Sequence, residues 1–132
     1  MQAVFTLTIV LGVLIAFTIA AAPSEEKKKV LNECKAQEKA TDIELQQILS
    51  NKLPQSMNGK CLTACYYEKT GVIKNGKVVA DALKANVMKE YPGGNANGFV
   101  TECQGVNHGQ RCELGALVNE CVNKAAVKFG PK

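Results

Sequence analysis

The sequence predicts a small all-α domain of about six short helices that is crosslinked by disulfide bonds. Apolar residues recur at helical spacing in several segments, while the strand pattern of alternating apolar and polar residues is almost missing. All six cysteines follow residue 33, and an even number of cysteines in a short secreted chain is typical of a disulfide framework. A length of 132 residues predicts a single domain.

The N-terminal segment has the composition of a signal peptide. Residues 1–22 contain no charged side chain, and Ala20 and Ala22 give the small-x-small pattern of a cleavage site before Pro23. The length would also fit a membrane-spanning helix, but the position and the small residues favour cleavage. We therefore expect a signal peptide over residues 1–22 and a secreted domain over residues 23–132 that is not embedded in a membrane.

Two helices are expected before Pro54. Ser24 can cap a first helix that runs to about Lys39, and Thr41 or Asp42 can cap a second one. The apolar face of this second helix consists of Leu45, Ile48, Leu49 and Leu53. Pro54 then interrupts the backbone hydrogen bonding.

The third helix is expected from Gln55 or Asn58 to Thr70, because Gly71 stands where a C-terminal glycine cap belongs. Asn75-Gly76 predicts a tight turn. A fourth helix is expected over about 79–91, with an apolar stripe of Val79, Ala82, Leu83, Val87 and Tyr91.

The last two helices are expected over about 96–103 and about 110–128, separated by a loop at 105–109. The apolar stripe of the sixth helix consists of Leu114, Leu117, Val118, Cys121 and Ala125. These stripes predict a common core, which is either solid or encloses a cavity.

Helix geometry limits how the cysteines can pair. Cys61 and Cys65 lie on one face of consecutive turns, so a bond between them would constrain only their own helix. Cys112 and Cys121 lie nine residues apart, on opposite faces and about 13.5 Å apart along the axis, beyond the roughly 7 Å limit between the Cα atoms of a disulfide. Ten of the fifteen pairings of six cysteines remain open.

The spacing C-x26-C-x3-C-x37-C-x8-C-x8-C resembles the signature of the six-cysteine insect odorant-binding proteins, the pheromone-binding/general-odorant-binding protein family. The resemblance covers the whole of residues 23–132. It implies an internal apolar cavity surrounded by about six helices and three interlocked disulfides. The implied pairs are Cys34 with Cys65, Cys61 with Cys112, and Cys103 with Cys121.

The resemblance also implies a function. Such proteins are extracellular carriers that bind and solubilise small hydrophobic molecules, namely odorants, pheromones or related lipids, and deliver them toward membrane receptors. We therefore expect a small hydrophobic ligand, an odorant receptor as partner, a monomer or weak homodimer, and neither enzymatic activity nor a cofactor. The alternative is a secreted defence or salivary protein that uses the same scaffold and acts through its surface.

Other classes of function have little support in the sequence. No C-x2-C pair is present, so a zinc site is not expected. The single histidine, His108, lies in a polar loop with no nucleophile motif beside it. The net charge of +4 is mild, and Lys27–Lys29 directly follows Glu25-Glu26, so we expect no nucleic-acid partner.

The expected ligand contacts are flexible or apolar side chains of the predicted helices, together with one tyrosine. They are Leu53, Met57, Leu62, Tyr66, Leu83, Val87, Met88, Phe99, Leu114, Leu117 and Phe129. Phe129 is the only aromatic residue after the last cysteine and is expected to plug the pocket, since the family often folds its tail over it. Further candidates for a polar tether to the ligand are Ser56, Thr63, Tyr67 and Tyr91.

Overall fold

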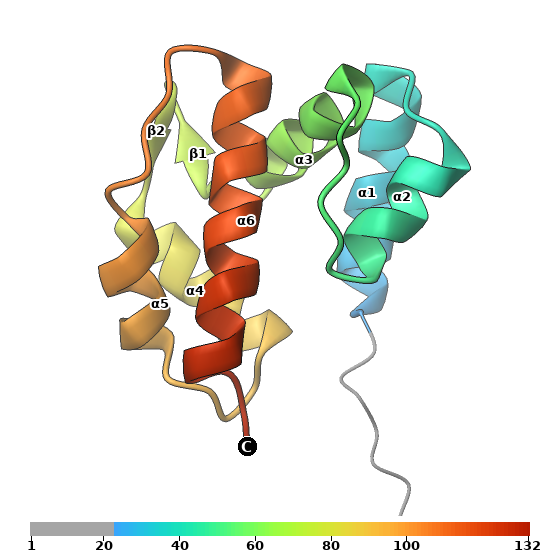
Figure 1. Ribbon diagram of the computed structural model, residues 1–132. Coiled ribbons are helices and arrows are strands. Elements are labelled where there is room, and N and C mark those ends of the chain that lie inside the picture. Colours follow the sequence, from blue (N-terminus) through green and yellow to red (C-terminus); the bar gives the residue numbers. More distant parts are fainter. Residues whose placement is uncertain (1–22) are drawn as a thin grey trace, which may run out of the picture.

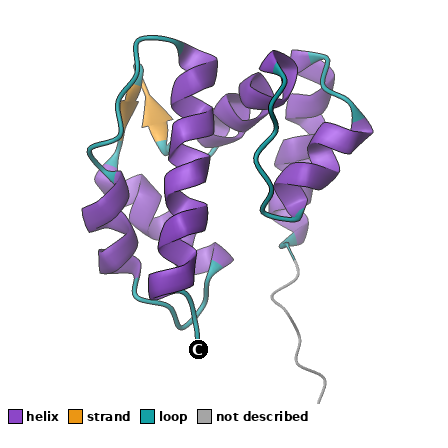
Figure 2. Ribbon diagram, in the orientation of Figure 1, coloured by secondary structure: helices purple, strands orange, loops and turns teal. Residues whose placement is uncertain are grey.

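The computed structural model describes residues 23–132, and the expected signal peptide at residues 1–22 lies outside the described residues. The described part forms six helices and two short strands, which confirms the all-α prediction (Figure 1, Figure 2). The helices are α1 (Glu25–Glu38), α2 (Asp42–Leu49), α3 (Met57–Lys69), α4 (Ala80–Glu90), α5 (Ala96–Cys103) and α6 (Arg111–Phe129). The strands are β1 (Ile73–Lys74) and β2 (Lys77–Val78).

Side-chain caps explain where most helices begin. The Ser24 hydroxyl accepts a hydrogen bond from the Lys27 N–H at the start of α1. Thr41 and Glu44 form a reciprocal capping box on α2, and Ser56 caps α3. Each cap provides an acceptor for an N–H group that has no partner inside the helix.

The structure differs from the expectation at the end of α2 and after α3. Helix α2 ends at Leu49 and Asn51 adopts a left-handed conformation (φ 57°), so Leu53 does not continue the apolar face of the helix. The Asn75-Gly76 turn does form, and it joins β1 and β2 in an antiparallel hairpin. Two residues per strand are too few for the alternation that predicts a strand from sequence.

Helix α3 lies at the centre of the fold. It packs against α1 on one side and α6 on the other, while α5 packs against both α4 and α6. Figure 1 shows α1 and α2 on one side of the molecule and α4 and α5 on the other, with α3 running between them. The core is formed by the inward faces of these helices and includes Leu31, Leu62, Phe99, Leu114 and Val118.

All six cysteines lie in the described part and form three disulfide bonds, Cys34–Cys65, Cys61–Cys112 and Cys103–Cys121. These are the pairs that the family resemblance implied, and they are interlocked along the chain as expected. They tie α3 to α1, α3 to α6, and α5 to α6.

Within residues 23–132, no helix is both long and apolar enough to cross a membrane.

Candidate ligand-binding site

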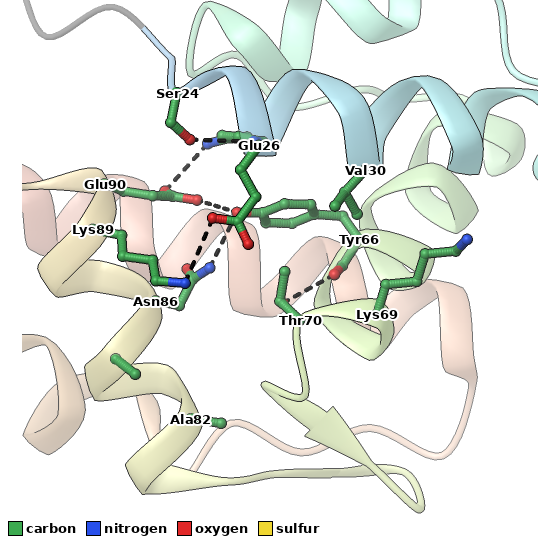
Figure 3. A pocket seen from close by; sticks show the side chains of 12 residues that line it. Ser24, Glu26, Val30, Tyr66, Lys69, Thr70, Ala82, Asn86, Lys89 and Glu90 are labelled. Atoms are coloured by element: carbon green, nitrogen blue, oxygen red, sulfur yellow. Dashed lines mark hydrogen bonds and ion pairs between the residues drawn. The ribbon is translucent and has the colours of Figure 1, made fainter.

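A pocket of about 390 Å³ lies between α1, α3 and α4. Val30, Ala82 and Ala85 contribute aliphatic wall, and Tyr66 contributes an aromatic ring. Exposed Ser24, Glu26 and Lys89 also line it and place its mouth at the surface. Figure 3 shows Glu26, Asn86 and Glu90 gathered around the Tyr66 hydroxyl. The pocket is therefore a partly apolar cleft with polar groups at defined positions.

The hydroxyl of Tyr66 is the centre of a polar network in this pocket. It donates a hydrogen bond to Glu90 Oε1 and accepts one from Asn86 Nδ2 at 3.1 Å. Glu90 Oε2 in turn pairs with Lys27 Nζ at 3.2 Å, and this ammonium lies 5.5 Å from the centroid of the Tyr66 ring. The network joins α1, α3 and α4 through side chains (Figure 3).

Burial raises the pKa of Tyr66 well above its ordinary value, and the negative charge of Glu90 raises it further. The phenol is therefore neutral at physiological pH and keeps the proton that it donates to Glu90. Because a phenol has one hydrogen, its oxygen can only accept from Asn86.

A second ion pair crosses the mouth of the pocket. Lys89 Nζ of α4 lies 3.5 Å from Glu26 Oε2 of α1, and both side chains are mostly exposed. The pair of Lys27 with Glu90 is in contrast largely buried. Exposed pairs contribute little to stability, so the outer pair can open at small cost.

Most of the predicted ligand contacts lie in the packed core. Five of them are buried in the same apolar cluster as Tyr66: Leu62, Leu83, Val87, Phe99 and Leu114. Tyr66 is the one predicted contact that also lines the pocket between α1, α3 and α4. A ligand that enters this pocket would reach the other five only by displacing packed side chains.

Four further predicted contacts lie toward the surface. Met57, Met88 and Leu117 are 52%, 58% and 36% exposed as whole residues, and Leu53 is half-buried. Met88 follows Val87 by one residue, which turns it by about 100° away from the buried stripe of α4. Leu117 borders a surface hollow beside Cys121 and Lys124 instead of the pocket at Tyr66.

Phe129 is the last residue of α6 and packs on α5. Its ring centroid lies 6.2 Å from that of Phe99, and its backbone carbonyl accepts a hydrogen bond from the Asn95 N–H. It does not line the pocket at Tyr66. The tail thus packs against the core on the α5 side, and its expected role as a plug remains a prediction.

The other candidate tethers have partners of their own. Ser56 caps α3, the Thr63 hydroxyl donates to the Gly59 carbonyl, and the Tyr67 hydroxyl donates to Asn119. Tyr91 stacks on Phe99 with ring centroids 5.1 Å apart. The hydroxyls of Ser56, Thr63 and Tyr67 are thus used within the fold, and Tyr91 does not line the pocket at Tyr66.

Sequence reasoning missed Asn86, Glu90 and Lys27. Asn86 offered a signal, because it falls seven residues after Val79 and three after Leu83 and therefore lies on the apolar stripe of α4. A polar residue on an apolar face is an informative exception. Glu90 and Lys27 gave no such signal, since their pairing joins two helices far apart in the sequence.

Residues 23–132 contain no cluster of three histidine, cysteine or acidic residues placed to hold a metal ion.

Comparisons with known proteins agree with this architecture. The chain is 26% identical over 137 aligned positions to general odorant-binding protein 19d of Drosophila melanogaster, an alignment that covers 95% of this chain and 91% of that protein.

Two solved structures share the fold. The odorant-binding protein dmelOBP28a of Drosophila melanogaster superposes with a TM-score of 0.70 at 24% identity, over 78% of this chain and 92% of that chain. The fatty acid binding protein OBP56a from the oral disk of the blowfly Phormia regina superposes with a TM-score of 0.63 at 23% identity, over 80% of this chain and 96% of that chain. Residues 19–125 match the PBP/GOBP family, and the chain belongs to this family of odorant-binding proteins.

Proposed function

We propose that the protein is an extracellular carrier that takes up one small hydrophobic molecule in the pocket between α1, α3 and α4. The pocket is the observation that carries the proposal: its volume of about 390 Å³ lies within the range of about 300–1,000 Å³ that is usual for small-molecule sites. Membership of the PBP/GOBP family supports the hydrophobic character of the ligand. The name of the blowfly protein, a fatty acid binding protein, supports a lipid-like molecule.

The driving force would be the burial of apolar surface, which supplies about 25 cal/mol per Å². Burial of roughly 300 Å² of ligand would then yield about 7.5 kcal/mol before ordering costs are subtracted. Micromolar affinity corresponds to about −8 kcal/mol, so a low micromolar dissociation constant is the expected strength.

Secretion and delivery to a membrane receptor are further parts of the proposal. Three disulfides require an oxidising compartment, which supports export from the cytosol. Delivery needs release, and the exposed pair of Lys89 with Glu26 at the pocket mouth is a contact that opens easily. Contact of the ligand with core side chains such as Leu62 and Phe99 stays a prediction. It requires that the pocket deepens when the ligand binds.

The test uses protein purified from the medium of cells that express the full chain. We expect an uncharged fluorescent probe to bind at about one molecule per chain and ligand excess to raise the melting temperature, by mass action. Ala85→Trp places a large ring at the pocket and should abolish binding. Ala36→Trp is the matched control, since Ala36 is an exposed alanine on α1 away from this pocket.

Three results would contradict the proposal. Retention of the chain inside the cells would contradict export. Unchanged probe binding by Ala85→Trp would contradict this pocket as the site. If alcohols, esters and aldehydes of medium chain length neither displaced the probe nor raised the melting temperature, carriage itself would be refuted, and a protein that acts through its surface would be the better interpretation.

A further inference from the structure

The side chain of Asn86 has one hydrogen-bonding atom that the fold does not use. Asn86 is 8% exposed and lines the pocket between α1, α3 and α4. Its Nδ2 donates to the Tyr66 hydroxyl, but its Oδ1 is buried without a hydrogen-bond partner among residues 23–132. A buried acceptor that lacks a donor is destabilising.

The orientation of this amide follows from its neighbours. The single hydrogen of the Tyr66 hydroxyl goes to the Glu90 carboxylate, which is the stronger acceptor. The Tyr66 oxygen can therefore only accept, and Asn86 must turn its NH₂ group toward it. A flipped amide would set two acceptors against each other, so the unused atom is the carbonyl oxygen.

The charged groups of the pocket are already paired. Lys27 pairs with Glu90, and Lys89 pairs with Glu26. Lys69 pairs with Glu33 at 3.3 Å. Each lysine that lines the pocket thus has a carboxylate partner, and each carboxylate that lines it has a lysine. The charged side chains that line the pocket thus already have partners of opposite charge, whereas Asn86 Oδ1 lacks a donor that a ligand hydroxyl would supply.

We propose that this pocket selects a neutral ligand with a hydroxyl group, such as a medium-chain alcohol, whose hydroxyl donates to Asn86 Oδ1. The proposal rests on the proposed carrier function and specifies its ligand class. The alkyl chain would lie along Val30, Ala82 and Ala85, the aliphatic part of the wall.

Asn86 and Lys89 line the same pocket. Because Asn86 Oδ1 is buried, a ligand reaches it only when a side chain that lines the pocket moves. The Lys89 side chain is 66% exposed, so it can swing away toward water. A ligand hydroxyl that enters when Lys89 moves gains Asn86 Oδ1 as its acceptor and leaves the buried pair of Lys27 with Glu90 intact.

The experiment compares decanol with methyl nonyl ether, an isomer that has the same atoms but no hydrogen-bond donor, and with decanoate. We expect decanol to bind about tenfold more tightly than the ether, which is the factor given by one hydrogen bond worth about 1.4 kcal/mol. Decanoate should bind more weakly than decanol, because its carboxylate cannot donate. Asn86→Leu removes the acceptor and should make the affinities for decanol and the ether equal. Asn119→Leu, at the other buried asparagine that carries an unused polar atom, should keep the preference for decanol.

The outcomes separate the two proposals. Equal binding of decanol and the ether by the unaltered protein would refute the selection of a hydroxyl while leaving the carrier function intact. Tightest binding of decanoate, or a preference for decanol that persists in folded Asn86→Leu protein, would also refute it. If none of the three compounds bound, the carrier function would fail as well. The comparison of the isomers needs no variant and so does not depend on whether Asn86→Leu folds.

Discussion

Gly115 of α6 lies directly against the backbone of Ala64 in α3. A Cβ atom at position 115 would lie 2.4 Å from the Ala64 Cα and 2.5 Å from its backbone nitrogen. One turn earlier in each helix, the Cys61–Cys112 disulfide holds the two Cα atoms 4.3 Å apart. Glycine at position 115 is therefore what lets the two central helices approach so closely.

Gly115→Ala should destabilise the protein although alanine favours helix. The gain in helix propensity is about 1 kcal/mol, but the atoms in the way belong to backbone and cannot rotate aside. We expect a net loss of about 2 kcal/mol or more, which lowers the melting temperature by about 10 °C. Gly105→Ala, where the added atom meets open space, is the control and should change little. Equal melting temperatures for the two variants would contradict the close packing.

A similar contact joins the C-terminal end of α6 to α5. A Cβ atom at Gly98 would lie 2.4 Å from Cδ1 of the Phe129 ring. Gly98→Ala should therefore displace the ring and lower the melting temperature. In a Phe129→Ala background the same change should be neutral or stabilising, because the obstacle is gone. Additive effects in this double-mutant cycle would mean that the ring does not rest on Gly98.

The sequence predicted the helices better than the site, and the residues show why. Caps such as Ser24 and Thr41 act on neighbours three residues away, so they can be recognised in the sequence. The termination of α2 at Leu49 depends on the left-handed Asn51, for which the apolar pattern gave no sign. The pocket depends on contacts such as that of Lys27 with Glu90, which join residues 63 positions apart and cannot be read from periodicity.

Removal of the Cys61–Cys112 bond should cost more stability than removal of Cys103–Cys121. Loss of a native disulfide typically costs about 2–5 kcal/mol. The first bond spans 51 residues and the second 18, and the longer loop adds about 1 kcal/mol through the entropy of the unfolded chain. Paired Cys→Ser changes avoid a free thiol, and thermal unfolding of the two variants checks the order. If the double variant Cys61→Ser/Cys112→Ser melted at the same temperature as the unaltered protein, this bond would not be structural.

Stability should fall in alkali because of the tyrosines. Burial raises the pKa of Tyr66, Tyr67 and Tyr91, with a further contribution from the charge of Glu90, and the pKa of Tyr91 reaches about 12. An unfolded tyrosine titrates near pH 10. Above this pH the unfolded chain loses protons that the folded chain retains, so the free energy of unfolding decreases as the pH rises.

Tyrosinate absorbance and circular dichroism, recorded together on alkaline titration, check this. The three tyrosines are all that the chain contains, so the absorbance reports only on them. We expect no tyrosinate near pH 10 in the folded protein and a joint rise of absorbance and loss of helix at higher pH. Tyrosinate at pH 10 in a fully helical protein would contradict the burial of these phenols.

The two ion pairs between α1 and α4 should differ in energy although they lie side by side. The Lys27 and Glu90 side chains are 13% and 9% exposed, whereas those of Lys89 and Glu26 are 66% and 70% exposed. Lys27→Met leaves the Glu90 carboxylate largely buried without its cation, which should cost about 3 kcal/mol. Lys89→Met leaves Glu26 in water and should cost less than about 0.5 kcal/mol.

Adding Glu90→Gln to Lys27→Met removes the carboxylate charge that has lost its cation. This change should restore much of the lost stability, since Gln can still accept a hydrogen bond from Tyr66. Denaturant unfolding of the three variants gives the comparison, and equal losses for Lys27→Met and Lys89→Met would show that the inner pair is solvated as well as the outer one.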